Sequence, residues 1–293
     1  MKARFLALCA AGLLAAASTA SAQTGGFTLF GKSEVNSIKD EQRAVAPISD
    51  PYFHEDSFVS SDLRAWGIYQ KFPKGGLING GDAKVYALQF RLAITDRLQL
   101  VAYKDGYSDL SAGLIDEEGW NDVAAGLKYA VIQDWKNEFH LAIGLGYEFP
   151  IGDAKVLQNN GEIRAWASVN KGFGKLHLGA TLNVFYATST DEALGHSDYL
   201  SWHLHADYYL CKWFSPVIEV NGYHAYNKHD AVAGFSGVDV TNLGGGDDVV
   251  TLGVGGEFRI VKNLALRAAY ELPLTDGDDL YGWRLTFSAV IGF

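Results

Sequence analysis

The sequence predicts an all-β fold, namely a transmembrane antiparallel up-and-down β-barrel of about twelve strands. Three observations lead to this prediction. The chain begins with an export signal, the remainder lacks any apolar run near the ~20 residues that a membrane-spanning helix requires, and apolar residues alternate with polar or small ones in many segments. A barrel wall has lipid on one side and a lumen on the other, so each of its strands needs that alternation.

Residues 1–22 have the three parts of a secretory signal. Lys2 and Arg4 give a basic start, residues 5–17 are apolar, and Ala-Ser-Ala at residues 20–22 is a small-residue cleavage site. Removing the signal takes away two of the 24 basic residues and none of the 34 acidic ones, so 22 basic residues face 34 acidic ones and the formal net charge becomes −12. This balance argues against nucleic acid as a partner.

Residues 23–60 differ in composition from the rest of the chain. Charged residues are interleaved with few large apolar ones, and Pro47 and Pro51 follow. Two interpretations remain open: a periplasmic N-terminal extension, or a plug that folds into the barrel. The barrel itself is predicted over residues 61–293.

The last strand shows the alternation most clearly. Between residues 281 and 293 every odd position is apolar, and most even positions are polar or glycine. Residues 139–149 and 176–186 repeat this period of two, which helical spacing cannot produce. On the same basis we predict strands at residues 62–72, 84–94, 97–104, 119–131, 138–149, 161–172, 175–187, 198–211, 214–226, 248–260, 263–272 and 281–293.

The segments between these strands alternate between long loops and short turns. Outer-membrane barrels have short turns in the periplasm and long loops outside, and the alternation therefore places both termini in the periplasm. The first strand has the weakest pattern, so a ten-stranded barrel is the alternative. Aromatic residues cluster near strand ends, where the two membrane interfaces are expected: Tyr147, Phe149, Tyr199, Trp202, Tyr281 and Trp283 near the outer ends, and Tyr129, Trp135, Phe173, Trp213, Phe214 and Phe293 near the inner ends.

The segment 285–293, which alternates and ends in an aromatic residue, resembles the last strand of Gram-negative outer-membrane barrels. The resemblance implies that Phe287, Ile291 and Phe293 form a signal read by the barrel-assembly machinery. It also implies a location in the cell outer membrane, among outer-membrane lipid and lipopolysaccharide. Two further segments, 244–251 and 269–275, resemble outer-membrane transporters of the phenol-degradation MetA type, a likeness that implies a location more than an activity.

Charged and histidine side chains occupy many inward positions of the predicted strands. They form either an ion-paired lining that stabilises the wall or a charge ladder that screens solutes. Pairing around the turn at residues 261–262 should place Glu257 opposite Arg267. The candidate lumen-lining residues are Arg91, Asp122, Lys128, Glu148, Glu162, Arg164, His203, His205, Asp207, Glu219, Glu257, Arg259, Arg267, Glu271 and Arg284.

The six long loops carry fifteen acidic and three basic residues. An acidic outer mouth concentrates cations by its field, so we expect any pore to prefer cations. The candidate residues of this mouth are Asp116, Glu117, Glu118, Asp276, Asp278 and Asp279.

No motif predicts a catalytic, metal or cofactor site. His203, His205 and Asp207 share one strand face, but ligands two apart on a strand are ~7 Å apart and need another strand to complete a metal site. The residues of His196-Ser197-Asp198 are sequence neighbours, which cannot form the relay of a hydrolytic triad.

The function favoured by the sequence is a passive channel or facilitator for small solutes that prefers cations, with the solute unknown. One alternative is a narrow, filled barrel that binds or transports hydrophobic compounds. Another is a structural or adhesion protein of the cell surface. An outer-membrane hydrolase is less favoured, because no segment resembles the catalytic stretches of outer-membrane phospholipases or proteases and the fold alone does not assign a function.

Overall fold

The computed structural model describes residues 26–31, 39–74, 79–112, 115–156, 158–159, 161–188, 198–227, 248–275 and 281–293. The export signal predicted at residues 1–22 lies outside this part of the chain, as do Asp276, Asp278 and Asp279 of the predicted acidic mouth. No helix within the described ranges has both the length and the apolar character needed to cross a membrane.

The described strands form one antiparallel sheet that closes on itself because β1 pairs with both β2 and β14. Two short 3-10 turns, η2 (Asp40–Gln42) and η3 (Ala154–Val156), accompany the sheet. The strands are β1 (Asp62–Lys71), β2 (Gly81–Ala93), β3 (Leu98–Lys104), β4 (Tyr107–Ala112), β5 (Ile115–Trp120), β6 (Val123–Asp134), β7 (Phe139–Phe149), β8 (Glu162–Phe173), β9 (Leu176–Ala187), β10 (Asp198–Tyr208), β11 (Phe214–Asn227), β12 (Val249–Val261), β13 (Leu264–Pro273) and β14 (Trp283–Gly292).

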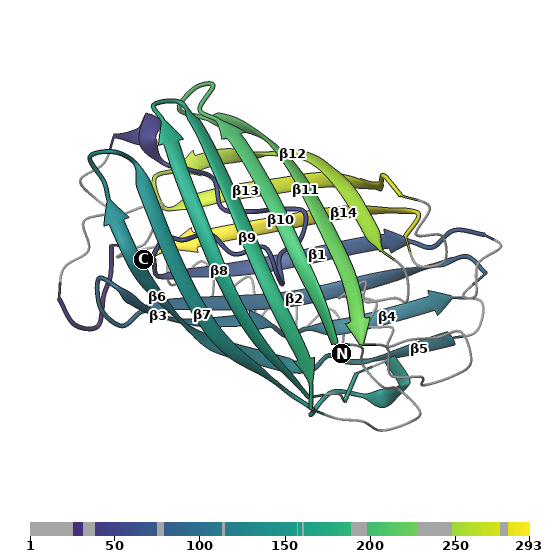
Figure 1. Cartoon of the computed structure of the whole chain (residues 1–293). Coiled ribbons are helices and arrows are strands. Elements are labelled where there is room, and N and C mark those ends of the chain that lie inside the picture. Colours follow the sequence, from purple (N-terminus) through teal and green to yellow (C-terminus); the bar gives the residue numbers. More distant parts are fainter. Residues whose placement is uncertain are drawn as a thin grey trace.

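These strands occupy twelve positions around the barrel, as the sequence predicts. β3 and β4 pair with successive stretches of β2 and count as one wall strand, while β5 and β6 pair with β4 and β3 and count as the next. Figure 1 shows the strands crossing the barrel at a common tilt, as closure requires. The ten-stranded alternative is therefore wrong.

The predicted loop at residues 105–118 is in fact mostly strand. Asp105 and Gly106 interrupt the wall strand without ending it, since β4 continues along β2 beyond them. The Asp105 carboxylate accepts the backbone N–H of Leu88 at 2.8 Å, and Gly106 has a φ of 127°, which favours glycine. A turn-like dipeptide thus marks a bend in the wall, a feature that alternation alone does not distinguish from a strand end.

The two faces of the wall differ as a membrane barrel requires. Large apolar side chains point outward, with Leu145 61%, Val254 55% and Phe287 51% exposed, whereas the inner face carries buried polar side chains. Tyr199 and Tyr281, expected at the outer interface, are instead buried inside the barrel, each 2% exposed. Tyr199 lies four and six positions before His203 and His205, which are predicted to face inward on the same strand, so the period of two places it on their face.

Residues 43–60, hereafter the inserted segment, lie inside the barrel (Figure 1). The segment enters and leaves at the end where the short turns lie. Gln42 donates to Glu138 at 2.6 Å at one end of the segment, and Phe293 N–H donates to the Ser61 carbonyl at 3.1 Å at the other. Between them the chain reverses at residues 50–54, where His54 N–H bonds the Asp50 carbonyl at 3.2 Å.

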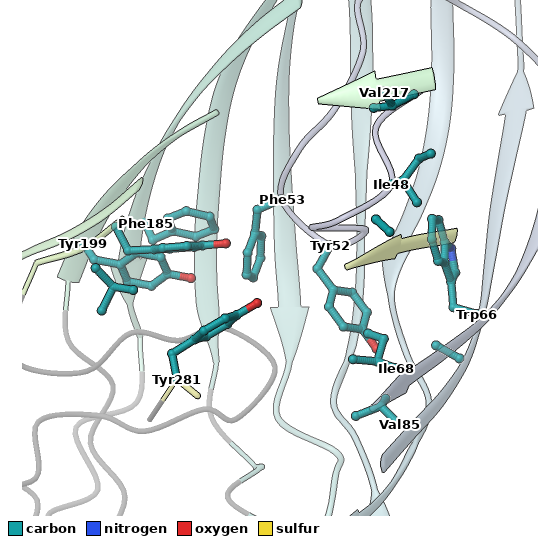
Figure 2. Packing of buried hydrophobic residues seen from close by; sticks show 14 of the residues in the cluster. Ile48, Tyr52, Phe53, Trp66, Ile68, Val85, Phe185, Tyr199, Val217 and Tyr281 are labelled. Atoms are coloured by element: carbon teal, nitrogen blue, oxygen red, sulfur yellow. The ribbon is translucent and has the colours of Figure 1, made fainter. Parts of the chain in front are cut away.

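Apolar contacts surround the tip of the inserted segment (Figure 2). The ring of Phe53 meets that of Phe185 edge-on at 4.8 Å, and Phe185 stacks on Tyr199 at 4.1 Å. On the other side Ile48 and Tyr52 belong to the same buried cluster as wall residues of β1 and β2. Part of the barrel's core is therefore built by the inserted segment.

Candidate functional site in the bore

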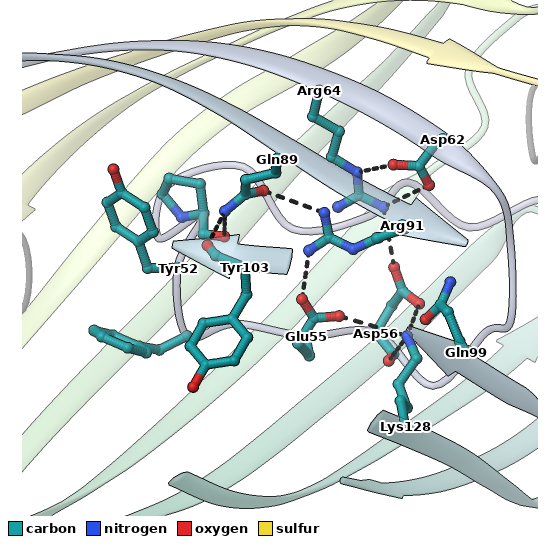
Figure 3. A network of polar contacts seen from close by, with 12 residues as sticks. Tyr52, Glu55, Asp56, Asp62, Arg64, Gln89, Arg91, Gln99, Tyr103 and Lys128 are labelled. Atoms are coloured by element: carbon teal, nitrogen blue, oxygen red, sulfur yellow. Dashed lines mark hydrogen bonds and ion pairs between the residues drawn. The ribbon is translucent and has the colours of Figure 1, made fainter. Parts of the chain in front are cut away.

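One side of the bore is basic and holds two carboxylates of the inserted segment. Glu55 forms ion pairs with Arg91 of β2 and with Lys128 of β6, the latter at 3.4 Å. Lys128 also contacts the Asp56 carboxylate at 3.3 Å and its carbonyl at 3.0 Å, and Arg64 of β1 lies 3.8 Å from Asp56. Figure 3 shows these side chains converging between the wall strands and the segment.

The charges of this cluster balance only when the segment is in place. Among the described residues, the wall supplies Arg64, Arg91 and Lys128 to this cluster and one carboxylate, that of Asp62, which accepts a hydrogen bond from Arg64 Nε at 2.6 Å. Glu55 and Asp56 of the segment supply the two missing negative charges. Burial by itself would raise the pKa of Glu55, but Arg91 and Lys128 lower it to about 2, so this carboxylate is ionised at neutral pH.

The opposite side of the bore accepts hydrogen bonds from the segment's main chain. Glu219 of β11 accepts the N–H groups of Ile48 and Ser49 at 3.0 and 2.6 Å. Asp207 of β10 accepts the N–H of Val45 at 3.0 Å. His205 lies between these two carboxylates, at 2.7 Å from Glu219 and 3.1 Å from Asp207.

Adjacent residues of the inserted segment point to opposite walls. The ring of His54 stacks on His203 of β10 at 5.0 Å, whereas Glu55 reaches the basic cluster on β2 and β6. Strand β10 lies on the opposite side of the closed sheet from β2 and β6. Burial lowers the pKa of His54 well below its usual range, the Glu219 carboxylate opposes this, and the imidazoles of His203 and His205 reinforce it.

Neutral and basic side chains of the wall donate hydrogen bonds to the segment's carbonyl groups. Asn183 bonds the Phe53 carbonyl at 3.1 Å, and Gln99 bonds that of Ser60 at 2.6 Å. Arg164 donates to the carbonyls of Tyr52 at 2.9 Å and Phe53 at 2.7 Å. The guanidinium of Arg164 also lies over the rings of Tyr103 and Trp166, so its position is fixed on both sides.

A glycine of the wall makes room for the segment. A Cβ at Gly253 of β12 would lie 2.7 Å from both side-chain atoms of Ser49. Such a contact is closer than a real Cβ allows, so any larger residue at Gly253 would displace the segment or the strand. The inward glycine in this alternating strand thus serves close packing.

The structure places all fifteen candidate lumen residues in buried positions, none more than 7% exposed. Eight of them contact the inserted segment: Arg91, Lys128, Arg164, His203, His205, Asp207, Glu219 and Arg259. The others are used mainly within the wall or by a loop. Asp122 accepts the N–H groups of Ile151, Gly152 and Asn159, so it organises a loop.

The expected cross-strand pair is confirmed. Glu257 lies opposite Arg267 in the register of β12 and β13, and Arg267 Nε donates to it at 2.7 Å. Two similar pairs stay within the wall: Glu148 with Lys104, and Glu271 with Arg284 at 3.6 Å. Glu162 is buried at the start of β8, 1% exposed.

The candidate residues of the acidic mouth and of the assembly signal lie outside the bore or at its ends. Asp116, Glu117 and Glu118 are exposed on β5. Of the proposed assembly signal, Phe287 faces outward and is 51% exposed, whereas Ile291, on the same alternating face of β14, is 5% exposed. The ring of Phe293 lies 6.1 Å from that of Phe27.

Sequence reasoning did not single out His54, Glu55 and Asp56, because they lie in residues 23–60, which carry no regular hydrophobic period. It also passed over the neutral donors of the wall, Gln99 and Asn183. Alternation indicates that they face inward, but it does not reveal which carbonyl groups they bind. Among the described residues no group of three or more His, Cys, Asp or Glu side chains is arranged to hold a metal ion.

No protein-family model matches this sequence, and no curated protein does. Solved structures do match. The NanC porin aligns over 80% of this chain and 99% of its own, with a TM-score of 0.51 at 11% identity. The KdgM porin aligns over 79% and 99%, with a TM-score of 0.48 at 11% identity, and outer membrane phospholipase A from Escherichia coli over 80% and 94%, with a TM-score of 0.41 at 13% identity.

The chain has the fold of an outer-membrane β-barrel. At this identity the likeness concerns the fold alone, and a fold does not assign a function.

Proposed function

We propose that this protein is an outer-membrane channel for small solutes whose bore is closed by the inserted segment. Its apolar outer face and porin-like fold support a place in the outer membrane, with both termini in the periplasm and delivery by the barrel-assembly machinery.

The observation that carries the proposal is the chemistry of the bore. A barrel filled only for stability is served by apolar side chains, because buried ion pairs add little net stability. Here the wall instead presents charged and polar groups to a segment that is covalently continuous with β1 and leaves by the end at which it entered. Water and a polar solute can satisfy the same groups when the segment withdraws.

A filled barrel without a channel is the second candidate. It is favoured by the tight fit near the short-turn end, where two cavities between the wall and the segment measure about 10 and 30 Å³, room for one or two water molecules. The apolar cluster around Phe53 adds to this density.

Conductance of the purified full chain in a planar bilayer tests the proposal. We expect a mostly closed protein with discrete openings, since the segment must withdraw before ions pass. Folding is checked by the difference in gel mobility between unboiled and boiled samples, because a closed barrel has no edge from which detergent can unzip it. Folded protein that never conducts at any voltage would refute the channel and favour the filled barrel.

We propose further that the open channel prefers cations. Asp116, Glu117 and Glu118 are exposed at one end of the barrel and attract cations by their field, which is screened over ~10 Å at 0.1 M salt. Reversal potentials in a salt gradient should show a cation preference that fades as ionic strength rises and as these three residues are neutralised. Anion preference, or indifference to both changes, would contradict this mechanism.

A further inference from the structure

We propose that the bore contains a binding site for acidic amino acids and short acidic peptides, and that the inserted segment occupies this site in the closed state. The inference rests on the proposed channel function in one respect, because a solute reaches the site only when the segment withdraws. It names the class of solute that the wall recognises.

The wall binds the inserted segment as a receptor binds a peptide. Side chains of the wall accept N–H groups of the segment's backbone on one side, through Glu219 and Asp207. Other side chains donate to its carbonyls, through Arg164 to residues 52 and 53 and through Asn183 to residue 53. These contacts recognise N–H and C=O groups, which the main chain of every peptide carries.

A carboxylate is the one side-chain feature that the basic side requires. When the segment withdraws, Arg64, Arg91 and Lys128 retain Asp62 as the one nearby acid of the wall within the described part of the chain. Leaving such buried charges without partners is energetically costly. A solute with one or two carboxylates restores the balance that Glu55 and Asp56 provide in the closed state.

The two sides of the bore together select for a molecule with both kinds of group. The acidic side on β10 and β11 takes N–H or ammonium groups, and the basic side on β1, β2 and β6 takes carboxylates. His54 and Glu55 show that consecutive residues of one peptide reach both sides. An acidic amino acid or a short acidic peptide meets both demands.

The tethered segment competes strongly with any solute, since its effective concentration in the bore is high. The test therefore uses Glu55→Gln, which keeps the shape of the side chain and removes its charge. Two synthetic peptides serve as probes: acetyl-His-Glu-Asp-amide, which repeats residues 54–56, and its neutral analogue acetyl-His-Gln-Asn-amide. Glu41→Gln, which removes an equal charge outside the inserted segment, is the control variant.

We expect Glu55→Gln to conduct more than the unaltered chain and the Glu41→Gln control. The acidic peptide should block this current at a concentration about tenfold or more below that of the neutral peptide, given the energy of charge-assisted hydrogen bonds. Adding Lys128→Met to Glu55→Gln should remove most of this difference. Equal block by the two peptides, or a difference that survives Lys128→Met, would overturn the site.

Failure of the channel and failure of the site give separate results. If no variant conducts, the proposed channel is wrong, and calorimetry of the same peptides with folded Glu55→Gln protein decides the site. Tighter binding of the acidic peptide supports the site, and equal or absent binding overturns it. If Glu55→Gln does not fold, Glu55→Asp, which retains the charge but withdraws it from Arg91 and Lys128, is measured by the same criteria.

Discussion

Replacing Arg164 by Met should release the tip of the inserted segment. Met retains apolar contact with the rings of Tyr103 and Trp166 but loses the donors to the carbonyls of Tyr52 and Phe53. Two hydrogen bonds from a charged donor contribute about 3 to 6 kcal/mol. Wall contacts to the Phe53 carbonyl persist without Arg164, so we expect the lower end of this range, which corresponds to about a 10²-fold increase in the population of released segment.

Hydrogen exchange of the detergent-solubilised full chain measures this release. Amides of residues 43–60 should exchange about 10²-fold faster in Arg164→Met, while the wall strands keep their protection, because exchange reports local opening separately from global unfolding. Arg97→Met is the matched control, since Arg97 also donates to two backbone carbonyls but at the short-turn end and outside the segment. Unchanged exchange of residues 43–60, or loss of protection throughout the barrel, would refute the reasoning.

Three further predictions concern the packing, the outer face and the pH response. Gly253→Val should drive Ser49 away and accelerate exchange in residues 43–60, whereas Gly67→Val, which faces open space, should not; equal effects would show that the glycine is not a packing site. Leu145→Lys should lower the free energy of unfolding by about 2 to 4 kcal/mol in a urea titration with lipid, if this outward side chain lies near the bilayer midplane. Because the pKa of docked His54 is lowered, docking should be strongest above pH 6.5 and weaken as pH falls below it; exchange corrected for its intrinsic pH dependence checks this, and stronger docking at pH 5 would contradict it.

Alternation made the wall predictable from sequence. Inward and outward positions repeat every two residues, and Glu257 could be paired with Arg267 by counting from one short turn. The same parity would have placed Tyr199 inside the barrel, but its aromatic character near a strand end was interpreted as an interface anchor. Local pattern therefore fixed the direction of each side chain more reliably than residue type did.

The contents of the bore were less accessible to sequence reasoning. Residues 43–60 have no regular period, so both an extension and a plug remained open. Their position depends on contacts between residues far apart in sequence, such as Ser49 with Glu219 and Glu55 with Arg91. Counting charges along single strands does not reveal which distant residues pair, nor that carboxylates of the inserted segment balance the basic residues of the wall.

The path of the inserted segment has a consequence for assembly. Because its two ends lie at the same rim of the barrel, the segment forms a re-entrant loop and does not thread from one opening to the other. Strand β1 follows it directly and pairs with the last strand, β14, to form the seam of the barrel. The loop can consequently leave or return through one opening while that seam stays hydrogen-bonded, so that opening and closing the bore involves no chain end and no break in the sheet.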